Sequence, residues 1–171
     1  MLTEHPQFFT ATILELKHLL KPDKYKDIVM QSLHFLVSNK RILLYGFVIM
    51  PNHIHLIWQK RENIRQSDVQ RDFLKYTAQQ IKFDLQQNHP AVLEKFRVNV
   101  KDRQYQLWEH RPLSISLWSR RVFEQKLDYI HQNPVQEKWK LADLPENYSY
   151  SSARYYLLNQ DDWGFITHYA E

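Results

Sequence analysis

The feature that most constrains this chain is residues 47–59, two apolar runs that flank a Pro51-Asn52 break. The second run carries His53 and His55 one residue apart. Because side chains alternate between the two faces of a strand, both histidines project to the same side while Ile54 faces the core. Two imidazoles side by side on a strand supply half of a divalent-metal site. The alternative is an ordinary strand with a polar face, since two ligands rarely define a site without a third.

Composition places the chain among globular proteins of one domain, which we expect to span residues 1–171. Hydrophobic residues make up 43% and charged residues 25%, a balance that disordered proteins do not have. Aromatic residues reach 14%, more than a core of this size requires, so some rings are expected on a binding surface. The formal charge of +4 weakly favours anionic partners.

Several function classes are excluded by what the sequence lacks. The chain has no cysteine, which excludes disulfides, thiolate chemistry and cysteine-ligated zinc. No apolar run approaches the length of a membrane span, and the N-terminus has no signal-peptide pattern. We therefore expect a cytoplasmic protein without a membrane partner.

The first half of the chain reads as alternating strands and helices. Residues 8–16 predict a strand, residues 23–39 a helix, and residues 41–50 a second strand. A hairpin at Pro51-Asn52 then leads into the strand that bears the histidines. Ser67 and Gln70 have the spacing of a capping box, which predicts a helix from Ser67 to about Gln87.

The second half is less regular. Residues 91–96 predict a short helix, residues 97–103 a charged loop, and residues 104–116 a strand broken near Pro112. The last long helix is expected over residues 117–133, ending because Pro134 disfavours helical geometry at the residue before it. This order predicts an α+β fold, a ferredoxin-like split βαβ antiparallel sheet packed by helices, with an added C-terminal helix.

That added helix carries a second pair of chemically useful side chains. Its core stripe is Phe123, Leu127 and Ile130, whereas Tyr129 and Asn133 lie four residues apart on a face of their own. The amide oxygen of Asn133 can be a third metal ligand, and the phenol of Tyr129 can be a nucleophile one turn away. The alternative is a half-buried tyrosine and an asparagine that caps the helix.

The two pairs make chemical sense together. Attack of a tyrosine oxygen on a phosphodiester requires neutralised phosphate charge and a nucleophile held in line. A metal on His53, His55 and Asn133 leaves open positions for that phosphate. A phenolate is a moderate leaving group, so a phosphotyrosine formed at Tyr129 can be resealed later.

Four segments of the sequence resemble one protein family. Residues 48–56, with His53-Ile54-His55, resemble the His-hydrophobic-His motif of the HUH single-strand transposases. Residues 129–135, with Tyr129 and Asn133-Pro134, resemble the nucleophile motif of the REP-associated tyrosine transposases. Residues 71–77 and 148–154 resemble further segments of that branch, in the same order. One departure is residues 136–139, where the branch often has a glycine.

The resemblance implies a specific chemistry. The family has a ferredoxin-like domain, depends on Mg²⁺ or Mn²⁺, and cleaves single-stranded DNA through a 5′-phosphotyrosine that leaves a free 3′-OH. By position in the motifs, it implies a metal on His53, His55 and Asn133 and makes Tyr129 the nucleophile. His131 lies about 200° around the helix from Tyr129 and is not expected to be a ligand.

The DNA contacts are less defined. Lys75 and Arg154 are candidates for phosphate contacts, and the tail tyrosines for stacking on unpaired bases. Lone basic residues are more often solvated, and tyrosines often complete a core. The candidates in the tail are Tyr148 and Tyr150, with Tyr155 and Tyr156 beside them.

The sequence thus predicts a metal-dependent transposase that nicks and rejoins single-stranded DNA and recognises a hairpin with flanking sequence. The alternatives are a DNA-binding protein of the same fold that no longer cuts, and a metal-dependent nuclease that uses water. Intact His53, His55, Tyr129 and Asn133 argue against the non-cutting protein, because binding alone needs no phenol beside a metal. Whether the protein acts as a homodimer is left open.

Overall fold

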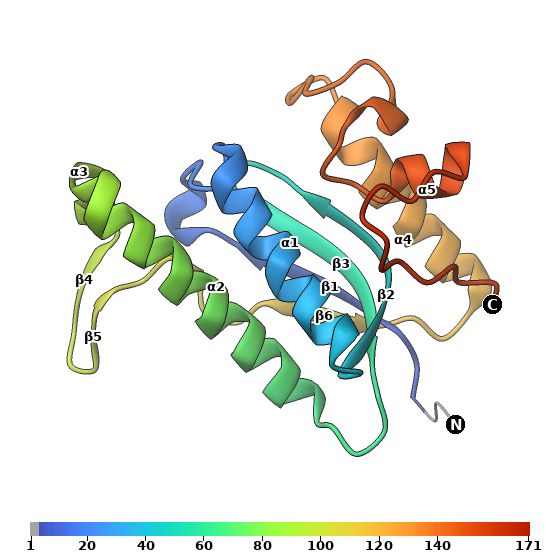
Figure 1. The fold of residues 1–171 in the computed structure, drawn as a ribbon, viewed down its shortest axis with the longest axis horizontal. Coiled ribbons are helices and arrows are strands. Elements are labelled where there is room, and N and C mark those ends of the chain that lie inside the picture. Colours follow the sequence, from blue (N-terminus) through green and yellow to red (C-terminus); the bar gives the residue numbers. More distant parts are fainter. Residues whose placement is uncertain (1–3) are drawn as a thin grey trace.

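The computed structural model describes residues 4–171 and is built around a four-stranded antiparallel sheet (Figure 1). Its spatial order is β2-β3-β1-β6, in which every pair of neighbours is antiparallel. This is the order of a ferredoxin-like split βαβ sheet, so the predicted fold class is confirmed. The four strands are β1 (Gln7–Thr12), β2 (Ile42–Ile49), β3 (His53–Lys60) and β6 (Leu113–Ser116).

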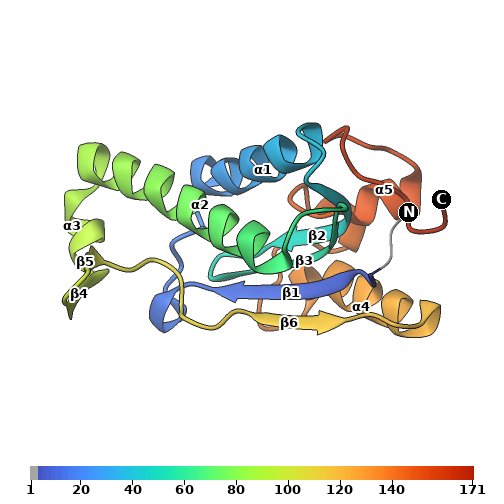
Figure 2. The same cartoon turned by 90° about the horizontal axis from the view of Figure 1, so that it is seen from below.

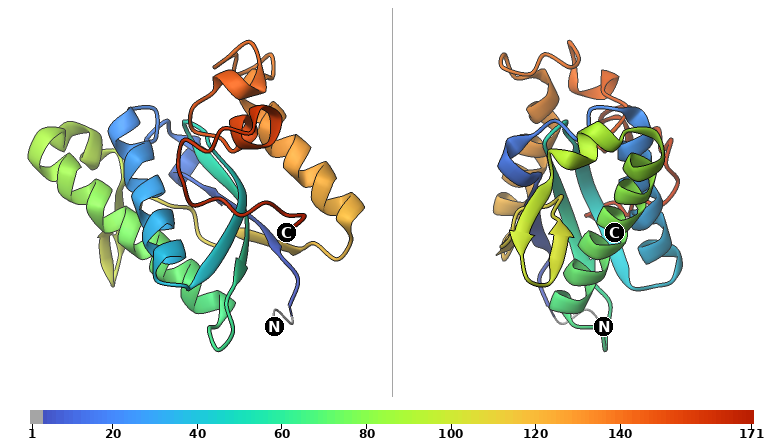
Figure 3. Two further views of the ribbon diagram at one scale, coloured as in Figure 1. Left: turned by 45° about the vertical axis from the view of Figure 1, so that its right-hand side comes forward. Right: turned by 90° about the vertical axis from the view of Figure 1, so that its left-hand side faces the viewer.

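Helices cover both faces of the sheet. Two long helices pack on one face and α4 packs on the other, while the C-terminal tail runs along the β2 edge (Figures 2 and 3). A small hairpin of β4 and β5 is inserted between α2 and β6 and lies away from the main sheet. The helices are α1 (Asp23–Ser38), α2 (Gln66–Asn88), α3 (Pro90–Glu94), α4 (Arg120–Gln132) and α5 (Ala153–Leu158), and the hairpin strands are β4 (Arg97–Val100) and β5 (Arg103–Tyr105).

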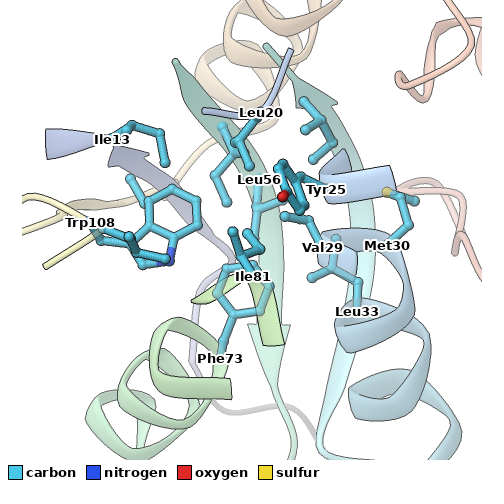
Figure 4. Close-up of a cluster of buried hydrophobic side chains, with 14 of the residues drawn as sticks. Ile13, Leu20, Tyr25, Val29, Met30, Leu33, Leu56, Phe73, Ile81 and Trp108 are labelled. Atoms are coloured by element: carbon cyan, nitrogen blue, oxygen red, sulfur yellow. The ribbon is translucent and has the colours of Figure 1, made fainter. Parts of the chain in front are cut away.

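The main core lies between α1, α2 and the sheet (Figure 4). Residues at helical spacing on α1, such as Val29 and Leu33, are fully buried there, as is Phe73 of α2. From the sheet, Ile54 and Leu56 alternate with the histidines of β3 and reach the same core. This alternation fixes the register of β3, because a slip of one residue would send both histidines into the apolar layer.

The histidine face of the sheet is covered too, contrary to the expectation that it lies outside the core. A second, smaller apolar cluster joins Val48 and Ile57 of the sheet to Phe123, Leu127 and Ile130 of α4. The stripe predicted on α4 is therefore confirmed, and it brings α4 directly onto β2 and β3. The side chains of His53 and His55 lie between α4 and the sheet.

Gly46 sets how closely α4 approaches. An ideal Cβ built on Gly46 would lie 2.6 Å from Cδ1 of Leu127, well inside van der Waals contact. Gly46 also sits where the β2–β3 register shifts by one residue, at a β-bulge after Leu44. A side chain at this position would have to displace the Leu127 side chain or the helix that carries it.

The tail covers one edge of the sheet and leaves the other open. Ser151 bridges to Val48, and the amide of Ile49 donates to the carbonyl of Tyr150 at 2.9 Å, so the tail runs along β2. On the opposite edge, β6 pairs only with β1 among residues 4–171. Within residues 4–171 no helix is both long and apolar enough to cross a membrane.

Several predicted boundaries are wrong. The first strand ends at Thr12, after which a 3₁₀ turn over Leu14–Leu16 follows, with positive φ at Glu15. Helix α2 begins at Gln66 after Arg65, which has no side-chain cap, so Ser67 lies inside the first turn and no capping box forms. Two backbone bonds to the Arg65 carbonyl start the helix early.

The remaining corrections concern the later segments. The predicted charged loop over residues 97–103 contains β4 and the start of β5; both strands are largely exposed, so no apolar alternation marks them. Within residues 104–116, β6 occupies only the part after Pro112. Helix α4 begins at Arg120, because the Ser119 hydroxyl accepts from the Val122 amide and caps it. Asn133 keeps helical dihedrals despite Pro134 and continues into a 3₁₀ turn.

Candidate active site

Strand β3 places both histidines over the middle of the sheet. His53 is opposite Thr12 of β1, and His55 lies between Thr10 of β1 and Val48 of β2. The two-residue turn at Pro51-Asn52 joins β2 to β3, as predicted, through a bond from the Met50 amide to the His53 carbonyl. The rings stand 4.8 Å apart between centroids, on the side that faces α4.

Each histidine has one ring nitrogen engaged and the other directed inward. Nδ1 of His55 is 2.8 Å from the Thr10 hydroxyl, and Nδ1 of His53 is 2.7 Å from the side-chain oxygen of Asn52. With a proton on each Nδ1, both Nε2 atoms carry lone pairs. Outer partners of this kind fix the tautomer and orientation of metal-binding histidines.

Both imidazoles are held neutral. Burial is the main cause that lowers the pKa of His55 to about 3 and that of His53 to about 4. Positive charge adds to this, from Lys138 for His53, and from His53 itself and Lys126 for His55. Neutral imidazole is the form that binds metal, so the site keeps its ligands unprotonated well below neutral pH.

Helix α4 brings the second pair of residues to the same place. Nδ2 of Asn133 is 3.5 Å from Nε2 of His53, and Asn133 is almost fully buried. The ring of Tyr129 stands edge-on to His55 at 5.3 Å between centroids and contacts Phe8 at 6.3 Å. Tyr129 is 45% exposed, so the ring faces both the histidines and solvent. The four predicted residues therefore meet in one site.

The donor set fits a divalent metal. Nε2 of His55 is buried and has no hydrogen-bond partner in the described chain, a costly arrangement that a bound cation would relieve. Within residues 4–171, no three side chains of His, Cys, Asp or Glu gather as a metal site. A third protein ligand must then be another type of group, and the carboxamide of Asn133 is the one beside His53.

The sequence did not point to four residues that shape this site. Thr10 and Asn52 orient the imidazoles, and nothing in their types distinguishes them before the strand register is known. The ammonium of Lys126 lies 6.0 Å from the ring centroid of Tyr129 and 4.9 Å from that of Phe8. Lys126 lies one turn before Tyr129 on α4, so its helical spacing from Tyr129 is a sequence signal that could have identified it. The ring of Trp139 lies 6.0 Å from that of His53.

Three of the predicted DNA contacts have structural partners. The hydroxyl of Tyr148 donates to the Ile49 carbonyl at 2.6 Å, and that of Tyr150 to Asp27 at 2.8 Å. Arg154 is paired with Asp162 at 3.0 Å. These contacts favour the alternative that the three side chains complete the fold. Lys75, by contrast, is exposed on α2.

His131 is separate from the site, as expected from its helical position. Nε2 of His131 is 2.9 Å from the Ser152 hydroxyl, and the ring packs against Tyr156. Burial lowers the pKa of His131 to about 4. Its contacts join α4 to the tail.

Comparison with solved structures identifies the fold. A REP-associated tyrosine transposase bound to a REP hairpin superposes with a TM-score of 0.65 at 17% identity, over 96% of this chain and 86% of that chain. A Deinococcus radiodurans protein described as a transposase matches with a TM-score of 0.52 at 14% identity, over 77% of this chain and 92% of that one. No family model and no curated protein matches the sequence. The chain has the fold of a REP-associated tyrosine transposase.

Proposed function

We propose that this protein is a metal-dependent transposase that nicks and rejoins single-stranded DNA through a 5′-phosphotyrosine at Tyr129. The observation that carries the proposal is the meeting of Tyr129 of α4 and Asn133, at the C-terminal end of that helix, with His53 and His55 of β3. A structural tyrosine or a helix-capping asparagine alone would not require two buried, neutral histidines beside it. The transposase fold of the neighbours agrees with this chemistry.

The reaction is a transesterification. The Tyr129 oxygen forms a bond to phosphorus, and the bond from phosphorus to the 3′ oxygen of the preceding nucleotide breaks. The departing 3′ oxygen takes a proton, and the phenol proton is released to solvent, which reaches the half-exposed ring. Attack of a 3′-OH on the phosphotyrosine reverses these steps and reseals a strand.

The residues of the chain have distinct roles in this proposal. His53, His55 and Asn133 would hold Mg²⁺ or Mn²⁺, which would neutralise the nonbridging phosphate oxygens. The packing of α4 on β3 holds the phenol near that position, and the nearby ammonium of Lys126 adds positive charge. The proposed substrate is a hairpin with a single-stranded flank, in line with the hairpin bound to the structural neighbour.

The decisive test replaces Tyr129 with phenylalanine. Tyr129→Phe removes one oxygen, so folding, metal binding and DNA affinity should barely change while cleavage falls by several orders of magnitude. The assay incubates single-stranded oligonucleotides with Mn²⁺ and looks for a protein–DNA adduct that survives denaturation. Mass spectrometry of wild-type tryptic peptides should find the nucleotide on the peptide that contains Tyr129.

The alternatives give different results. A nuclease that uses water would keep cutting after Tyr129→Phe and would leave no adduct. A DNA-binding protein of the same fold would show neither cleavage nor adduct in the wild type. Either outcome would replace the proposed mechanism.

A further inference from the structure

The candidate active site contains a lysine that has no acidic partner. Lys126 is half-buried on α4, and its ammonium lies 4.9 Å from the ring centroid of Phe8 and 6.0 Å from that of Tyr129. Within residues 4–171 no carboxylate forms an ion pair with it. Two aromatic rings, rather than an acid, therefore hold this charge in place. The residues three and four positions away on the helix, none of them acidic, are Val122, Phe123, Tyr129 and Ile130.

Lys126 is also close to the histidines. The ring of Phe8 lies beneath the ammonium and stacks on His55, with ring centroids 5.2 Å apart. The ring of Tyr129 is 5.3 Å from that of His55. After burial and the charge of His53, the positive charge of Lys126 is a further cause that lowers the pKa of His55. The lysine, the proposed nucleophile and one proposed metal ligand thus form one contiguous cluster.

The proposed metal ligands bring no negative charge to this cluster. His53, His55 and Asn133 are all neutral, because burial keeps both imidazoles unprotonated. The charged side chains that act on these imidazoles from outside the pair are both lysines. A divalent cation would add two more positive charges at a partly buried place, where like charges repel more strongly than in water. An anion is needed to balance this charge, and the phosphate that Tyr129 attacks is such an anion.

That phosphate comes within reach of Lys126. In-line attack brings phosphorus next to the Tyr129 oxygen, and the ammonium beside the same ring is carried on a flexible four-carbon stem. An ammonium donates through three N–H groups and binds phosphate oxygens as a point charge. Because it is already in the site, it can stabilise the negative charge on the nonbridging oxygens during attack.

We infer that Lys126 is a catalytic residue whose ammonium binds a nonbridging oxygen of the scissile phosphate. The inference rests on the proposed function and deepens it, because it assigns a group of the protein that binds this phosphate directly. Lys126 stays protonated throughout. The Tyr129 oxygen bonds to phosphorus, the phenol proton goes to solvent, the 3′ oxygen leaves and takes a proton from solvent, and no proton passes through the lysine. Lys126 therefore opposes metal binding while the site holds no DNA, and favours the reaction once the phosphate is bound.

The first test uses the opposite signs of these two effects. Without DNA, Lys126→Gln should bind Mn²⁺ about threefold more tightly than the wild type in a calorimetric titration at low salt. With Mn²⁺ and a random pool of short single strands, the same variant should form the Tyr129 adduct about a hundredfold more slowly, because one preorganised donor is lost. Lys126→Arg keeps the charge and should stay near the wild type in both measurements. A variant Lys126→Gln with unchanged or weaker Mn²⁺ affinity, or with a wild-type adduct rate, would overturn the inference.

A second test asks whether the phosphate itself is the partner of Lys126. Sequencing the DNA in adducts from the pool identifies the cleaved site, and that strand is then synthesised with a methylphosphonate at the scissile position. Each of its two isomers lacks one charged nonbridging oxygen. With one isomer, Lys126→Gln should slow adduct formation by less than about threefold, compared with about a hundredfold on the normal strand. Losses that stay equal on the normal strand and both isomers would show that the lysine acts on another group, and the inference would fall.

A matched control separates the site from the overall charge. Lys40 is exposed in the turn between α1 and β2, so Lys40→Gln removes the same charge and should keep the wild-type Mn²⁺ affinity and adduct rate. Failure of the proposed function would appear differently, as a wild type that forms no adduct with any strand of the pool. The Mn²⁺ titration requires neither DNA nor cleavage, so it tests the charge of Lys126 in that case too.

Discussion

At the scale of single residues, the most informative atom of the site is Nε2 of His55, which has no hydrogen-bond partner in the part of the chain that the structure describes. It is buried beside a second imidazole whose Nε2 faces a carboxamide, and each Nδ1 is fixed by a neighbour. A buried polar atom without a partner carries a cost of about 1–3 kcal/mol. This cost would be offset when Nε2 of His55 binds a metal ion.

Metal binding should therefore be measurable without DNA. Addition of Mn²⁺ should raise the melting temperature of the wild type, because a ligand that binds only the folded state stabilises it. His53→Ala and His55→Ala should each abolish this rise and the metal-dependent cleavage. Tyr129→Phe is the control and should keep the rise. An equal rise in the His53→Ala/His55→Ala double variant would show that the metal binds elsewhere.

His131 should make stability depend on pH. Its pKa is lowered to about 4 in the folded protein by burial, whereas in the unfolded chain it is expected near 6.5. Between these values the unfolded state binds more protons, so stability falls as the pH decreases from about 6.5 toward 4. Urea unfolding at pH 7 and pH 5 should show this loss. His131→Gln should reduce it by about 1–2 kcal/mol, and an unchanged loss would contradict the assignment.

At the scale of elements, the distance between α4 and the sheet decides whether the two halves of the site meet. Gly46→Ala would place a methyl group against Leu127, which is buried, so we expect a loss of about 1–3 kcal/mol in the free energy of unfolding. The displaced helix should also slow adduct formation at Tyr129. Denaturant unfolding and the adduct assay measure the two effects.

A second substitution tests the cause. In a Leu127→Ala background the methyl group has room, so Gly46→Ala should cost less there, and a double-mutant cycle measures the coupling. Additive costs would show that contact with Leu127 is not what requires the glycine.

An element can be predicted from the sequence where a regular pattern of apolar and polar residues marks it. The period of two in β3 and the apolar stripe of α4 predicted which side chains share a face, because polar and apolar residues recur there with the period of the element. The exposed β4–β5 hairpin carries no such alternation, so the sequence predicts a loop there. Thr10 and Lys126 gain their roles only from strand register and helix docking, which connect residues far apart in the chain.

At the scale of the whole molecule, the two faces of the sheet present different surfaces. On the α4 side, Tyr129 is 45% exposed and Trp118, just before the helix, is 79% exposed. On the α2 side, α2 and the segment that connects β5 to β6 line a cleft with cations such as Lys75 and Lys82, and the Trp108 ring beside them is buried. Exposed rings on which unpaired bases can stack thus lie on the side of the candidate active site.

This division predicts an order of affinities for DNA. A hairpin with a single-stranded flank should bind more tightly than a blunt duplex of equal length at the same salt, because only the flank can place unpaired bases beside exposed rings. Both ligands should weaken as salt rises, since both release counterions. The advantage of the hairpin should persist at high salt, because stacking is less screened than phosphate contacts. Equal affinities across the whole salt titration would show that the protein does not recognise single strands.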